Sequence, residues 1–188
     1  MTALARWLSI VLHPFVVIAL MVAVTSVKLE GGRSAGASVA MVAAFIIVPL
    51  AILMFLQVRR GAWENVDASR KSERPVLYAV GLGGSALLLG YLLLRQPGSF
   101  LIRGTAITLA TFGICAAITP WIKISLHAVS LGLAATVLIL LGSAAGWGLA
   151  ALAPALFWSR VHLGRHRVIE VALGAVVGLL GGLAIHFL

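Results

Sequence analysis

Charged residues are scarce in this 188-residue chain, because Asp, Glu, Lys and Arg together make up 10% of it while 62% is hydrophobic. Soluble domains usually carry about 25% charged residues. A soluble domain of this length could not bury so much apolar surface in one core. The composition therefore excludes an ordinary soluble fold and predicts that a lipid bilayer surrounds most of the chain.

Cysteine and carboxylates are also nearly absent. The single cysteine, Cys115, can form no disulfide within the chain and is expected to be a packing residue. The five acidic residues include one aspartate, Asp67. Asp67 and Glu73 are too few, and too close to Arg and Lys, to form a magnesium site. We therefore expect no metal ion, and we expect no nucleic-acid partner for a chain of this composition.

Apolar segments recur along the whole chain. They span residues 7–27, 38–58, 76–94, 104–119, 128–143, 147–160 and 168–188. A helix of about 20 apolar residues crosses the roughly 30 Å hydrocarbon core and satisfies its own backbone hydrogen bonds there. We predict an all-α transmembrane bundle forming a single integral membrane domain, residues 1–188, with two N-terminal helices in residues 1–58. The first segment is too long for a signal-peptide core and should remain as a helix.

The number of crossings depends on the fifth and sixth segments, because both are short. Gly142, Ser143, Gly146 and Gly148 provide the only break between them. A break here gives seven crossings, whereas one long tilted helix gives six. We favour seven because that count brings the polar segments to one side of the membrane.

The last apolar segment carries glycines at four-residue spacing, Gly174, Gly178 and Gly182. Small residues at this spacing form a flat strip on a helix. The strip predicts the close approach of a neighbouring helix, and it is also a possible surface for a homo-oligomer.

Polar residues gather in three segments between the apolar ones. Loop 59–75 holds five of the fourteen basic residues and three of the five acidic ones. Segment 120–127 contains Lys123 and His127, and segment 159–170 contains Arg160, His162, Arg165, His166, Arg167 and Glu170. With seven crossings, all three lie on the side of the N-terminus. Solvated loops explain the surface arginines. Ionisable groups within apolar helix ends are costly and usually functional, so the three segments are predicted to form one polar site.

An anion with several oxygens is the natural ligand of such a site, because Arg and Lys outnumber carboxylates there. Phosphate fits best. His166 and Glu170 are four residues apart, so on one helix face the carboxylate can bind one imidazole nitrogen and leave the other nucleophilic. His127 would then protonate the leaving oxygen.

These residues resemble the type 2 phosphatidic acid phosphatases, or lipid phosphate phosphatases, which are related in core fold to vanadium haloperoxidases. The family's third motif reads Ser-Arg, five residues, His, three residues, Asp. It is similar to Ser159-Arg160, VHLGR, His166, RVI and Glu170 in this chain. The second motif, Pro-Ser-Gly-His, resembles Ile124-Ser125-Leu126-His127, and the first motif ends in Arg74-Pro75. The motifs follow the family's order, and the resemblance covers roughly residues 67–188.

The resemblance implies a phosphatase-like core in residues 59–188 and metal-independent hydrolysis of a lipid phosphate or diphosphate, with no cofactor. In that reaction His166 forms a phosphohistidine, Glu170 orients it and His127 protonates the leaving group. The implied phosphate-binding residues are Arg74, Lys123, Ser125, Arg160 and Arg70. The family lysine of the first motif falls on Asp67. Arg70, Lys71 or Lys123 could supply that cation instead, and we favour Lys123.

Three other classes of protein compete with this interpretation. An anion or lipid transporter would bind the same ligand without turnover, but it would need polar residues deep in several helices. A magnesium-dependent prenyl transferase would need two Asp-rich motifs, which a chain with one aspartate lacks. A structural membrane subunit would leave the His166 and Glu170 spacing unexplained.

The substrate and the side of the membrane are predicted from simpler features. Membrane lipids are the expected partners, and we lean to a polyprenyl phosphate or diphosphate, because short loops leave little protein to recognise a large headgroup. On the side of the three polar segments lie ten basic residues, Arg6, Arg59, Arg60, Arg70, Lys71, Arg74, Lys123, Arg160, Arg165 and Arg167, against Lys28, Arg33, Arg95 and Arg103 on the other. The positive-inside tendency then places the site on the cytoplasmic face of the cell (inner) membrane.

Overall fold

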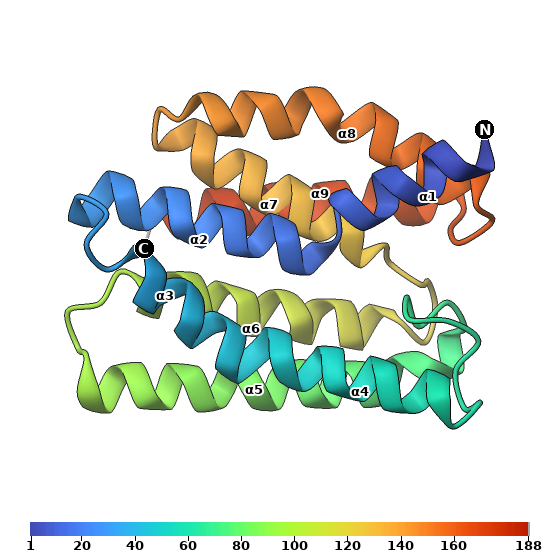
Figure 1. Cartoon of the computed structure of the whole chain (residues 1–188), viewed down its shortest axis with the longest axis horizontal. Helices are drawn as coiled ribbons and strands as arrows, with labels where there is room; N and C mark the ends of the chain where they lie inside the picture. The colour runs from blue at the N-terminus through green and yellow to red at the C-terminus, as the bar shows by residue number, and fades with distance from the viewer. Residues whose placement is uncertain (188) are drawn as a thin grey trace. The chain divides into compact units, whose positions relative to one another are not determined.

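The computed structural model describes the backbone of residues 1–187 and the side chains of residues 1–185, and it contains helices but no strand in this range. The helices are α1 (Thr2–Val11), α2 (Pro14–Glu30), α3 (Ala35–Val42), the π-helix η1 (Ala43–Ile47), α4 (Val48–Arg59), the 3-10 helix η2 (Lys71–Glu73), α5 (Arg74–Arg95), α6 (Leu101–Ile118), α7 (Leu126–Leu140), α8 (Ala144–His162) and α9 (Val168–Phe187). Figure 1 shows their arrangement.

Five helical stretches in the described residues are long and apolar enough to cross a membrane. They are Thr2–Glu30, Ala35–Arg59, Lys71–Arg95, Leu101–Ile118 and Val168–Ile185, and α7 is a shorter apolar helix. The prediction of an all-helical membrane protein is confirmed at this level. A count of six or seven crossings, and a phosphatase-like core, stay predictions.

The turn between α7 and α8 lies where the glycine and serine residues predicted a break. Gly142 has a positive φ of 64°, a conformation that glycine adopts without strain. Ser143 then caps α8 by accepting a hydrogen bond from the Ala145 amide. A Cβ on Gly146 would lie 2.5 Å from the Ile139 nitrogen, so this glycine lets α8 pack directly on α7. The alternative of one long helix through this region is wrong.

The helices group into two compact units. Unit 1 consists of Met1–Gly36 with Lys123–Leu188, and unit 2 is Ala37–Ile122. This grouping differs from a linear division at residue 58, because α1 and α2 pack with the C-terminal helices, whereas η1 and α4 pack on α5.

Unit 1 is organised around α7. This helix packs most extensively on α9 and also contacts α8 and α2, while α1 packs on α8 (Figure 1). Pro14 breaks the first helical stretch, because proline has no amide hydrogen to continue the ladder. His13 caps α2 through Nδ1, which accepts from the Phe15 amide at 3.3 Å.

The glycine strip on α9 is filled by α7 of the same chain. A Cβ on Gly178 would lie 2.2 Å from the Val129 carbonyl oxygen, and one on Gly174 would lie 2.7 Å from the Ser125 oxygen. The predicted close approach of a neighbouring helix is therefore confirmed. A homo-oligomer, which stays a prediction, would need a surface other than this strip.

Unit 2 is built on the antiparallel pair α5 and α6, with η1 and α4 packed on α5. Gly84 of α5 faces the π-helix so closely that a Cβ there would lie 2.2 Å from the Phe45 oxygen. The loop that precedes η2 belongs to this unit and carries Asp67 and Arg70, while Arg74 and Pro75 of the first motif begin α5.

Candidate functional site

The turn between α8 and α9 explains the spacing of the third motif. α8 ends at His162, and Gly164 adopts a positive φ of 66° that reverses the chain. The amides of Arg165 and His166 then both donate to the Arg160 carbonyl, at 3.1 and 3.2 Å. One helix end, one glycine turn and one helix start therefore place His166 next to the last turn of α8.

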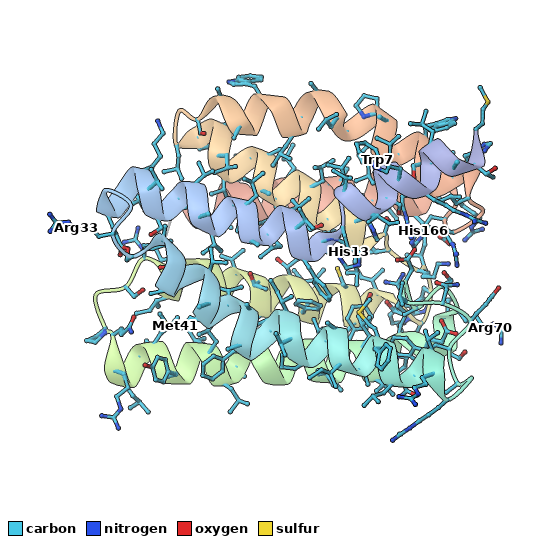
Figure 2. The ribbon with its side chains drawn as sticks, in the orientation of Figure 1. Trp7, His13, Arg33, Met41, Arg70 and His166 are labelled. Atoms are coloured by element: carbon cyan, nitrogen blue, oxygen red, sulfur yellow. The ribbon has the colours of Figure 1, made fainter. Side chains whose placement is uncertain are left out.

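His166 and Glu170 form a buried pair at this turn. The distance from His166 Nδ1 to Glu170 Oε2 is 2.9 Å, and the two side chains are 1% and 9% exposed. The same carboxylate accepts from the Arg167 amide at 3.2 Å and from Arg167 Nε at 3.3 Å. The predicted contact between His166 and Glu170 is thus present. Figure 2 shows His166 at one end of unit 1, opposite Arg33.

The N-terminus of α7 lies against the start of α9. The Ser125 amide donates to the Glu170 carbonyl at 3.1 Å, and Gly174 provides the space for this approach. Ser125 is the N-cap of α7 and is completely buried, yet its hydroxyl has no hydrogen-bond partner. A buried hydroxyl without a partner is unusual, so a ligand oxygen would satisfy it.

Lys123 binds the turn between α8 and α9. Its Nζ donates to the Arg165 carbonyl at 2.7 Å, directly before His166. The cation that we favoured as the replacement for the family lysine is therefore hydrogen-bonded to the backbone of the turn between α8 and α9, one residue before His166.

α1 supplies the remaining contacts of this site. Ser159 donates to the Ala5 carbonyl at 2.7 Å, and Arg160 Nη1 donates to Ser9 Oγ at 2.5 Å. His127 Nε2 lies 3.3 Å from the Ser9 carbonyl oxygen. Because a carbonyl only accepts, this contact places a hydrogen on Nε2 of His127.

Sequence reasoning missed the part played by α1, because this helix lies outside the segments that carry the motifs. Ser9 is its one contributor through a side chain, and His13 packs edge-on against His127 with ring centroids 5.2 Å apart. A signal was present in the sequence: a serine four residues before a His-Pro pair interrupts an otherwise apolar stretch. In Figure 2, His13 lies farther toward the middle of unit 1 than His166.

Unit 2 holds the two arginines that were assigned from the first motif. Arg74 is 2% exposed, and its Nε donates to the carbonyl of buried Ala68 at 2.9 Å. Arg70 instead pairs with Glu64 at 3.2 Å, with its side chain 67% exposed. Glu73 holds this loop by accepting from the amides of Arg70 and Glu64. Arg74, at the start of α5, therefore anchors the preceding loop through the Ala68 carbonyl, whereas Arg70 is a surface residue. A phosphate role for either arginine stays a prediction.

The site thus brings together, within unit 1, six of the eight residues that the sequence singled out: His127, His166, Glu170, Lys123, Ser125 and Arg160. Their chemistry is that of a buried imidazole held by a carboxylate, with two cations and an unsatisfied hydroxyl. In the comparisons with known proteins, no family model, no curated protein and no solved structure matches the chain.

Proposed function

We propose that this chain is a membrane-bound hydrolase that removes phosphate from a lipid phosphate or diphosphate through a phosphohistidine on His166. The observation that carries the proposal is the buried pair of His166 Nδ1 and Glu170 Oε2 at 2.9 Å. A carboxylate on Nδ1 keeps the imidazole hydrogen there, so Nε2 carries the lone pair and can act as the nucleophile.

The first step forms one bond and breaks another at phosphorus. His166 Nε2 attacks in line, and the bond from phosphorus to the leaving oxygen breaks. His127 gives that oxygen a proton. In the second step water attacks the phosphohistidine, its proton passes to His127 and the bond between phosphorus and nitrogen breaks. Inorganic phosphate then leaves, and both histidines have returned to their first state.

The phosphate oxygens need donors throughout both steps. Arg160 and Lys123 supply positive charge, and the Ser125 hydroxyl supplies a buried donor that lacks a partner. The amides in the first turn of α7 are further donors, because they have no carbonyl partner within their own helix. The helix dipole also favours an anion at this end. Preorganised donors of this kind stabilise the transition state of phosphoryl transfer.

The substrate class follows from what borders the site. In unit 1 the segments next to His166 are short, residues 163–167 and 123–125, so few side chains are available to recognise a large headgroup. The apolar helices that surround them suit a hydrocarbon chain. We therefore propose a polyprenyl phosphate or diphosphate as substrate, with phosphatidic acid and phosphatidylglycerol phosphate as the competitors in a substrate panel.

The test is phosphate release from that lipid panel by the purified protein in detergent, with a chelator present. We expect turnover by the wild type and loss of turnover in His166→Ala. His162→Ala is the matched control, because His162 is an exposed histidine at the end of α8 that stacks on Trp158 instead. In His127→Ala we expect a phosphoenzyme that survives acid quenching longer.

Three results would count against the proposal. Full activity in His166→Ala would remove the nucleophile. Binding of lipid phosphates without any release of phosphate would favour an anion or lipid transporter. A strict magnesium requirement would contradict a metal-independent mechanism and return attention to Asp67.

We also propose that the site lies on the cytoplasmic face of the cell (inner) membrane. The support is the excess of basic residues, ten against four, on the side of the polar segments. Single cysteines at Ala62 and at Ala35, with Cys115 replaced, report the orientation when intact cells meet a membrane-impermeant thiol reagent. We expect labelling at position 35 only, and labelling at position 62 only would reverse the assignment.

A further inference from the structure

α1 presents one narrow polar face to the rest of unit 1. Ala5 and Ser9, one helical turn apart, are buried, whereas Leu4, Trp7 and Ile10 are exposed. The two buried residues bond to α8 and α7, and Figure 1 shows α1 lying alongside α8. These contacts join α1 to Ser159, Arg160 and His127, at the candidate site.

Ser9 makes two of these contacts with two different groups. Its hydroxyl accepts a hydrogen bond from Arg160 Nη1, and its carbonyl oxygen lies 3.3 Å from His127 Nε2. Ser9 is 7% exposed, Arg160 1% and His127 5%, so both bonds are shielded from water. Hydrogen bonds are electrostatically stronger in such surroundings.

The Ser9 carbonyl is available because the helix breaks just after it. In an unbroken helix this carbonyl would accept from the amide of His13. Here the His13 amide bonds to Ile10 instead, at 3.2 Å. In a regular helix the amide of residue 14 would bond to the Ile10 carbonyl, and the His13 amide would bond to the Ser9 carbonyl. Pro14 has no amide hydrogen, so the Ile10 carbonyl accepts from His13 instead. The His-Pro break thus directs a backbone carbonyl of α1 toward His127.

We infer that Ser9 is a positioning residue that aligns Arg160 and His127 for the reaction, an inference that rests on the proposed function. The hydroxyl fixes one arm of the Arg160 guanidinium, and because that group is planar its remaining donors are then oriented as well. The carbonyl keeps the hydrogen on His127 Nε2, so Nδ1 is the nitrogen that carries the transferred proton.

The first experiment compares the wild type with Ser9→Ala and Ser9→Thr in the lipid phosphate assay. Loss of a hydrogen bond to a charged group should lower kcat by about 10- to 100-fold in Ser9→Ala, with KM nearly unchanged. Ser9→Thr keeps the hydroxyl and should restore most of the rate. Ser85→Ala is the control, because Ser85 is a completely buried serine whose hydroxyl has no partner.

A second variant separates the two contacts. Pro14→Ala supplies an amide for the Ile10 carbonyl, so the His13 amide can return to Ser9 and compete with His127. Loss of the proton donor matters most for poor leaving groups. We expect Pro14→Ala to lose activity on an alkyl lipid phosphate but to keep most of it on an activated aryl phosphate. Ser9→Ala should lose both activities equally.

The outcomes distinguish this inference from the proposed function. If the wild type turns over and Ser9→Ala folds with unchanged kcat and KM, the role of Ser9 is refuted and the function stands. If Ser9→Ala does not fold, equal losses on both substrates in Pro14→Ala refute the role instead. If no lipid phosphate is hydrolysed, the function fails. In that case, stabilisation of the wild type but not of Ser9→Ala by inorganic phosphate would still support the positioning of Arg160 by Ser9. Equal stabilisation of both proteins, or of neither, would overturn it.

Discussion

Substitution of Gly178 by alanine tests the packing that carries the site. A Cβ at this position would lie 2.2 Å from the Val129 carbonyl oxygen and 2.9 Å from the Leu133 nitrogen. Carbon and oxygen in close contact normally lie about 3.3 Å apart, so α7 and α9 would have to separate by about 1 Å. The obstructing atoms are backbone and cannot rotate away. We therefore expect the free energy of unfolding to fall by about 3 kcal/mol, at the upper end of the range for overpacked cores.

Thermal unfolding in detergent, followed by tryptophan fluorescence, measures this loss. For a chain of this length about 3 kcal/mol corresponds to a midpoint lower by about 6–12 °C. Gly148→Ala is the matched control, because Gly148 lies in α8 of the same unit and its Cβ would meet nothing within 4 Å. We expect Gly148→Ala to match the wild type or exceed it slightly. Equal midpoints for both variants would refute the packing of α7 on α9.

The remaining predictions concern the site and its loops. Glu170→Gln keeps the shape of the side chain that binds His166 but removes its charge, so phosphate release should fall at least about tenfold at unchanged fold, and an unchanged rate would contradict the orienting role. Gly174→Ala places a Cβ 2.7 Å from the Ser125 oxygen and should lower activity more than stability, as a paired activity and unfolding measurement would show. Arg74→Ala leaves a buried carbonyl unpaired and should destabilise the protein by about 1–3 kcal/mol. Arg70→Ala removes an exposed ion pair and should change stability by less than about 1 kcal/mol. Equal unfolding midpoints for the two variants would refute this difference.

Composition and spacing sufficed for the local features of this protein. A helix needs only its own residues to satisfy its backbone, so apolar segments predict helices without knowledge of their neighbours. For the same reason the contact of His166 with Glu170 followed from a four-residue separation on one helix. Gly142 and Ser143 likewise predicted a turn, because their conformational preferences are local.

Contacts between distant parts of the chain were decided only by the tertiary structure. Nothing in the spacing of the motifs pointed to Ser9, because it reaches Arg160 across 151 residues through the packing of α1 on α8. The glycine strip on α9 predicted a close neighbour but could not choose between α7 and a second copy, since both would present a similar apolar surface. Arg70 and Arg74 looked alike in sequence, and only the fold of the loop buried one and exposed the other. Side-chain chemistry is local, whereas burial depends on what the rest of the chain places against each residue.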